Sequence, residues 1–148
     1  GCGLHREPGL GLGHRPLALI DVSTGQQPLY NEDGSVVIVY NGEIYNYQSL
    51  LPELTALGHV FRTRSDTEVI VHAWEAWGEA CVERFRGMFA FALWDRNRKT
   101  LFLARDRLGV KPLHYALLAD GTFLFASEIK GLLAHPAFAR DIDPRAVE

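Results

Sequence analysis

The 148-residue sequence has only two cysteines, Cys2 and Cys81, and a single methionine. Two cysteines can form one disulfide at most, and their spacing matches neither a disulfide framework nor a CxxC metal site. Such low cysteine usage is typical of proteins from reducing compartments. We therefore expect a cytoplasmic protein.

Long apolar runs and basic clusters are also missing. No stretch approaches the roughly 18 consecutive apolar residues of a membrane span, and no basic segment followed by an apolar one marks a secretory signal. The net charge is -3 with both signs mixed, so no stripe of Lys and Arg can follow a phosphate backbone. The six histidines show no HxxxH or Cys/His ligand spacing. We expect no membrane, no nucleic acid and no metal as partner.

The sequence does have the composition of an ordinary globular domain, with 47% hydrophobic and 22% charged residues. Strand patterns flank a helical middle, which indicates an α+β architecture. The strands are predicted at 12–21, 35–40, 88–95, 100–106, 112–119 and 122–127, and the helices at 46–59, 65–85 and 127–134. Asn46 and a capping box from Ser65 to Glu68 are expected to start two of the helices, and Gly58 and Gly78 to interrupt or end them. Pro52 is expected to shorten or kink the first helix.

The segment YNGEIYN at positions 40–46 is the most informative part of the sequence. An Asn-Gly pair after a strand usually forms a hairpin turn, but the pattern that follows is a helix entrance. Asn41 and Gly42 are therefore predicted to end a buried strand, with a side-chain amide beside an unhindered backbone N–H. Such donors can form an oxyanion hole for acyl transfer. A plain turn is the alternative interpretation.

Several motifs together resemble those of glutamine-hydrolysing asparagine synthetases, in the same order and at similar spacing. They are GHRPLALID, TGQQPLYNEDG, YNGEIYN, RSDTE, GMFAFALWD and RDRLGVKPL. The resemblance covers about residues 11–135 and implies the glutaminase domain, a class II glutamine amidotransferase with the N-terminal nucleophile hydrolase fold. That fold is a four-layer αββα sandwich with the active site at one edge of two stacked sheets.

The resemblance also implies a catalytic apparatus. Cys2 corresponds to the nucleophile that attacks the side-chain amide of glutamine, with its own α-amine as the base. Asn41, through its side chain, and Gly42, through its backbone N–H, correspond to the oxyanion hole.

Four further residues correspond to the substrate-binding positions of the family. Asp66 matches the carboxylate that holds the α-ammonium group of glutamine, and Glu43 lies in the substrate-binding motif. Leu17 and Leu19 match positions whose backbone lines the substrate. Without the resemblance, Asp66 is equally well explained as an acid at a helix N-terminus.

The resemblance further implies a second, ATP-dependent domain that receives the ammonia. No SGGxDS-like phosphate loop occurs in the sequence, so ATP and Mg²⁺ are expected only in a domain outside this chain. We expect a glutaminase domain over residues 1–140 and the start of a linker over 141–148. The glutaminase domain itself is expected to need no cofactor, and a homodimer is a further expectation.

Three features depart from the family pattern. Pro16 stands where the family has an arginine that pairs with the glutamine α-carboxylate, Gly1 precedes the nucleophile, and CGL runs directly into HREPG. The last feature indicates residues missing between Leu4 and His5. A catalytically inactive scaffold with the same fold is therefore an alternative function, and a beta-lactam synthetase-like domain is a weaker one because such domains generally lack the cysteine.

Overall fold

The computed structural model describes residues 2–15, 26–141, 143 and 145. The chain divides into two compact units, Gly1–Lys111 and Pro112–Glu148. Among the described residues, no helix has the length and apolar character required to cross a bilayer. The domain expected over residues 1–140 includes most of both units and stays a prediction.

A four-stranded antiparallel sheet forms the centre of the first unit. Its strands, in spatial order, are β3 (Leu29–Tyr30), β4 (Val36–Ile44), β5 (Gly87–Asp95) and β6 (Thr100–Arg105). The two long strands pair along their whole length, from Val36 opposite Asp95 to Ile44 opposite Gly87. Their apolar runs fit inner strands that are covered on both faces.

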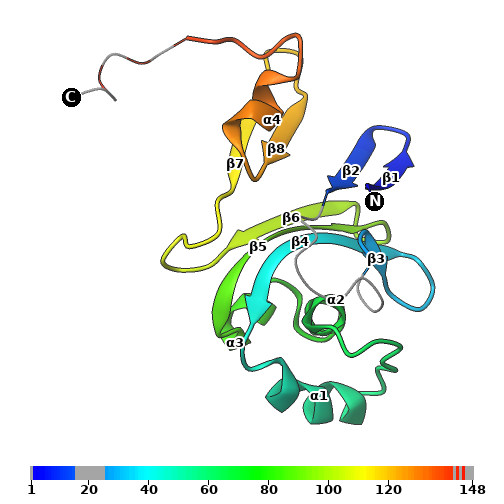
Figure 1. Cartoon of the computed structure of the whole chain (residues 1–148). Helices are drawn as coiled ribbons and strands as arrows, with labels where there is room; N and C mark the ends of the chain where they lie inside the picture. Colours follow the sequence, from blue (N-terminus) through cyan, green and yellow to red (C-terminus); the bar gives the residue numbers. More distant parts are fainter. Residues whose placement is uncertain (1, 16–25, 142, 144, 146–148) are drawn as a thin grey trace. The chain divides into compact units, whose positions relative to one another are not determined.

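Three helices cover one face of this sheet (Figure 1): α1 (Tyr47–Ala56), α2 (Asp66–Trp77) and the short α3 (Cys81–Arg84), which follows the 3-10 turn η1 (Gly78–Ala80). Because side chains alternate along a strand, every second residue of β4 points toward the helices. Val36, Ile38 and Tyr40 accordingly lie in one buried cluster with apolar residues of α1 and α2. The main core of this unit is therefore the layer between helices and sheet.

A hairpin of β1 (Gly3–Glu7) and β2 (Leu10–His14) lies over the opposite face, and β2 contacts β4. Leu12, Val37 and Val39 are buried although they lie outside the helix-side cluster. The HREPG segment, which the sequence analysis did not predict as a strand, supplies most of β1 and the turn into β2. The strand predicted at 12–21 thus begins earlier, and its second half lies outside the described residues.

The predicted helix boundaries are largely confirmed. The Ser65 hydroxyl accepts a hydrogen bond from the Thr67 N–H, and α2 ends at Gly78, which has a positive φ of 59°. A capping box would also have the Glu68 carboxylate accept from the Ser65 N–H. This part of the prediction is wrong, because Glu68 accepts hydrogen bonds from the backbone N–H groups of Arg62 and Thr63 instead. Asn46 also makes no side-chain cap for α1.

Asn46 instead connects α1 to the segment before β5. Its side-chain amide donates to the Arg84 carbonyl and accepts from the Arg86 N–H. The helix continues through Pro52, so the expected shortening at that residue is wrong. The helix ends in the predicted region, at Ala56, with Gly58 at a φ of 97°.

The second unit is a small hairpin with a helix. It contains β7 (His114–Leu117) paired with β8 (Phe123–Ala126), followed by α4 (Ile129–Leu133). A Cβ on Gly131 would lie 2.8 Å from the Cβ of Ala126, so a glycine allows α4 to pack closely on β8. The three elements predicted in this region are confirmed, with shorter strands.

We predict that Trp74→Phe lowers the free energy of unfolding by about 2–4 kcal/mol. Trp74 is buried and its indole Nε1 donates to Asp95 Oδ2 at 2.9 Å, so the change removes core volume and leaves a buried carboxylate oxygen without this donor. Urea unfolding followed by circular dichroism measures the change.

Trp94→Phe is the matched control, because the indole Nε1 of Trp94 has no hydrogen-bond partner in the described part of the chain. Its loss should change stability by less than about 1 kcal/mol. Equal losses for the two variants would contradict a stabilising role for the bond from Trp74 to Asp95.

Candidate active site

Asn41 and Gly42 lie inside β4 rather than at its end. The strand continues to Ile44, with Asn41 opposite Ala90 and Gly42 opposite Phe89. The prediction that this pair ends the strand is therefore wrong, because pairing with β5 outweighs the local turn preference of Asn-Gly. The side chain of Asn41 is exposed, as a candidate oxyanion donor must be.

Gly42 is required by the close approach of β5. A Cβ at this position would lie 2.1 Å from the Met88 carbonyl oxygen and 2.7 Å from the Phe89 Cα, and the residue has a φ of 148°. Both the steric contact and the backbone conformation disfavour any other residue. The backbone of β5 thus fills the space beside Gly42, and an unhindered N–H at this position stays a prediction.

Asp66, the first residue of α2, lies beside the last residues of β4, next to Tyr40 and Ile44. Its Oδ2 accepts a hydrogen bond from the Ile44 N–H at 2.8 Å and one from the Tyr40 hydroxyl at 2.6 Å. Burial, followed by the charge of Asp66, raises the pKa of Tyr40 above its usual range, so the phenol stays protonated and donates. Oδ1 of Asp66 makes no hydrogen bond with the described residues.

Cys2 is an exposed free cysteine directly before β1. Its neighbour Gly3 packs so closely on the loop before β3 that an added Cβ would lie 1.7 Å from the Gln27 carbonyl oxygen. The Gln27 side chain in turn accepts a hydrogen bond from the Tyr40 N–H at 2.5 Å. A short series of contacts therefore connects the start of β1 to the residue before Asn41.

Of the other predicted site residues, the structure describes Glu43 but not the two leucines. Glu43 lies in β4 with an exposed side chain, next to Gly42. Leu17 and Leu19, like Pro16, lie outside the described residues. Cys81, the other cysteine, is fully buried, and burial raises the pKa of its thiol to about 12. It is therefore a structural residue rather than a second nucleophile.

Sequence reasoning missed two residues of this region, Tyr40 and Gln27. The sequence pattern places Tyr40 only as the last residue of the strand predicted at 35–40. Nothing in a single sequence indicates that the side chain of Gln27, 13 positions earlier, accepts a hydrogen bond from its backbone N–H. Both contacts join segments that only the fold brings together.

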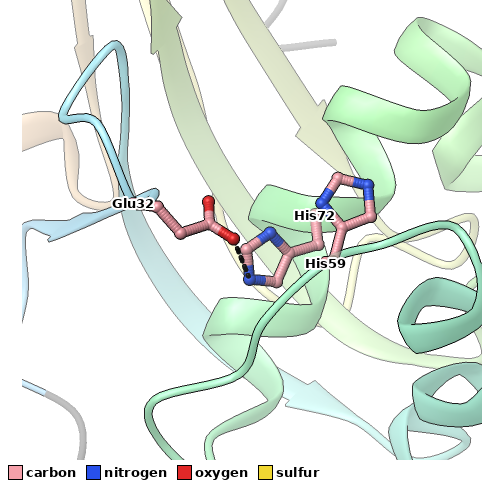
Figure 2. A group of neighbouring side chains, drawn as sticks. All are labelled: Glu32, His59 and His72. Atoms are coloured by element: carbon pink, nitrogen blue, oxygen red, sulfur yellow. Dashed lines mark ion pairs between the residues drawn. The ribbon is translucent and has the colours of Figure 1, made fainter.

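Histidines and glutamates form a separate cluster at the side of α2 that faces the β3–β4 turn. Figure 2 shows Glu32, His59 and His72, whose candidate ligand atoms all lie within 4.8 Å of one another. The Oε1 atom of Glu32 lies 3.9 Å from the Nε2 atom of His72. Spacing rules within the sequence could not reveal this group, because its members come from three separate segments.

The whole chain, residues 1–148, matches the family described as glutamine amidotransferase domain. It is 49% identical over 134 residues to asparagine synthetase [glutamine-hydrolyzing] 3 of Bacillus subtilis strain 168, a match that covers 88% of this chain and 22% of the relative. It is 46% identical over 130 residues to asparagine synthetase [glutamine-hydrolyzing] 2 of Oryza sativa subsp. japonica, which covers 88% of this chain and 22% of the relative. The chain thus spans about a fifth of the length of these relatives.

A solved structure supports the same relationship. Glutamine phosphoribosylpyrophosphate (PRPP) amidotransferase from B. subtilis, complexed with ADP and GMP, is similar with a TM-score of 0.63 and 26% identity over 82% of this chain and 28% of that chain. This likeness confirms the expected N-terminal nucleophile hydrolase fold. The resemblance to glutamine-hydrolysing asparagine synthetases is confirmed by the relatives above. Residues 1–148 therefore belong to the family of glutamine amidotransferase domains.

Proposed function

We propose that this chain hydrolyses the side-chain amide of glutamine to glutamate and ammonia, with Cys2 as the nucleophile. The observation that carries the proposal is that Asp66 binds Tyr40 and Ile44, which flank Asn41 and Gly42 in β4, in a glutamine amidotransferase domain. The exposed thiol of Cys2 and its contacts toward Tyr40, through Gly3 and Gln27, support it.

The reaction proceeds in two steps. The Cys2 sulfur attacks the amide carbon, and the thiol proton passes through the α-amine to the departing nitrogen, so that the C–N bond breaks and ammonia leaves. Water then attacks the γ-glutamyl thioester, which restores the thiol and releases glutamate. The Asn41 side-chain amide and the Gly42 N–H stabilise the oxyanion that forms in both steps.

Asp66 binds the α-ammonium group of the substrate. Its Oδ2 accepts from Tyr40 and Ile44, while Oδ1, which has no hydrogen-bond partner among the described residues, accepts from the ammonium group in this proposal. A charge-assisted hydrogen bond of this kind is about twice as strong as a neutral one. Glu43, Leu17 and Leu19 complete the substrate-binding surface in this proposal.

We further propose that the ammonia is used by an ATP-dependent synthetase domain, as in an asparagine synthetase. This chain covers only about a fifth of its relatives, whose names describe asparagine synthesis with glutamine hydrolysis. ATP and Mg²⁺ are then required by that other domain, and the hydrolysis of glutamine needs no cofactor. The low cysteine content supports a cytoplasmic location, and a homodimer remains part of the proposal.

We predict that Cys2→Ala abolishes ammonia release from glutamine, because it removes the atom that forms the thioester. A coupled glutamate dehydrogenase assay measures the ammonia. Cys81→Ala is the matched control, since this buried thiol lies among core residues and should leave hydrolysis within about twofold of the native rate.

The state of the N-terminus must be known before this assay is interpreted. Gly1 would convert the α-amine of Cys2 into an amide and displace the free amine by about 3.8 Å, so intact-mass measurement must first identify chains that begin at Cys2. Chains that begin at Cys2 but release no ammonia would contradict the proposal and favour the inactive scaffold, in which Pro16 has removed the partner of the α-carboxylate.

We also predict that Asp66→Asn raises KM for glutamine by roughly tenfold or more and changes kcat less. The amide keeps an oxygen that can accept from Ile44 and Tyr40 but loses the charge that attracts the ammonium group. Steady-state kinetics separates the two parameters, and Asp33→Asn, in an exposed turn, is the matched control. A fall in kcat with KM unchanged would contradict the binding role of Asp66.

A further inference from the structure

We propose that Glu32, His59 and His72 bind one divalent transition-metal ion, best matched by Zn²⁺ (Figure 2). The candidate ligands come from the turn before β4, the loop after α1 and the middle of α2. This site is separate from the proposed glutaminase residues and does not depend on their function.

His72 carries the central observation. Its side chain is only 1% exposed, and its Nε2 has no hydrogen-bond partner within the described residues. Its Nδ1 lies 2.9 Å from Glu75 Oε2, a distance at which an Nδ1–H donates to that carboxylate, and in the neutral ring this leaves the lone pair on Nε2. A histidine oriented by a carboxylate through one nitrogen and free at the other is the arrangement of a metal ligand.

The surroundings of Nε2 are negatively charged and therefore favour a cation. The Oε1 atoms of Glu68 and Glu32 lie 3.6 Å and 3.9 Å from it, respectively. A proton on Nε2 would face both oxygens beyond hydrogen-bond distance. A zinc ion forms bonds of about 2.1 Å to nitrogen and oxygen, so it can lie between the ring and a carboxylate at this separation.

Two of the nearby carboxylates are already occupied and act as supports. Glu68 accepts hydrogen bonds from the Arg62 N–H and from the backbone and hydroxyl of Thr63. Glu75 accepts from the Asn31 side chain as well as from His72. Their negative charges favour a cation in the space that His72 faces.

Glu32 and His59 are the ligands that can adjust. Donor atoms around a tetrahedral zinc ion lie about 3.4 Å apart, so separations of up to 4.8 Å between the ligand atoms must shorten by as much as about 1.4 Å. The Glu32 and His59 side chains are 35% and 18% exposed, which gives them room to move toward the buried His72. Water would occupy the fourth position on the exposed side.

The donor set selects the class of ion. Two imidazoles and one carboxylate suit zinc and similar transition metals, whereas Mg²⁺ and Ca²⁺ prefer oxygen ligands throughout. An ion here would link the turn before β4 and the loop after α1 to α2. Asp66 lies six residues before His72 on that helix, about 9 Å along its axis, so the expected effect is on stability rather than on the chemical step.

The test uses the full chain after removal of metals with a chelator. We expect isothermal titration calorimetry to detect one Zn²⁺ ion per chain, with no binding of Mg²⁺ at the same concentration. Thermal unfolding should shift upward by several degrees when Zn²⁺ is present well above its dissociation constant, because the ion binds the folded state.

Substitutions at the adjustable ligands avoid the risk that a change at buried His72 prevents folding. Glu32→Gln and His59→Gln should each weaken Zn²⁺ binding by roughly tenfold or more, whereas Glu83→Gln, an exposed acid on α3, should not. Cys2→Ser tests whether the exposed thiol binds the ion instead.

Three results would overturn the proposal. They are the absence of stoichiometric Zn²⁺ binding, binding that survives both Glu32→Gln and His59→Gln, and binding that is lost in Cys2→Ser. Each outcome concerns affinity and stability only, so it can be distinguished from a failure of glutamine hydrolysis.

Discussion

The carboxylate of Asp66 connects the first turn of α2 to the last residues of β4 through hydrogen bonds, and the arrangement of the candidate active site depends on this connection. One oxygen receives both the Ile44 N–H and the Tyr40 hydroxyl. The strand is thereby fixed on both sides of Asn41 and Gly42, while the acidic group lies at the N-terminus of α2, where the helix dipole favours negative charge. A single carboxylate oxygen thus ties the first turn of α2 to two positions of β4.

The two faces of β4 contact different parts of the first unit. Tyr40 points toward the helices and reaches Asp66, whereas its backbone N–H is held by Gln27 from the loop that packs on Gly3. The hairpin that begins next to Cys2 lies on the face opposite the helices (Figure 1). The proposed nucleophile and the proposed ammonium-binding carboxylate therefore approach the same strand from different layers.

Two carboxylates of α2, the buried Glu68 and the half-buried Glu75, organise the region where this helix faces the β3–β4 turn. Glu68 was expected to complete a capping box, but its two oxygens instead hold the backbone of Arg62 and Thr63. Glu75 orients His72 and binds Asn31. These contacts leave one buried imidazole nitrogen facing negative charge, which is the physical basis for a cation at this position.

The periodic and capped segments were predictable because their signals are local. The apolar run before Asn41, the Ser65 cap and the glycines at positions 58 and 78 each specify their element through neighbouring residues. The candidate site residues were found through motif resemblance rather than through spacing. The strand extension through Asn41 and Gly42 was not predictable, because pairing with β5 overrides a dipeptide that favours a turn by itself.

The amino-acid sequence alone determined the family resemblance, the α+β class and the identity of the chemical groups. Only the tertiary structure decided which of these groups contact one another: Asp66 and Tyr40, Gln27 and the backbone of Tyr40, and His72 and Glu32. The physical reason is that a hydrogen bond or an ion site depends on distances of a few ångströms between side chains. Chain order does not fix those distances for residues that lie far apart in the sequence.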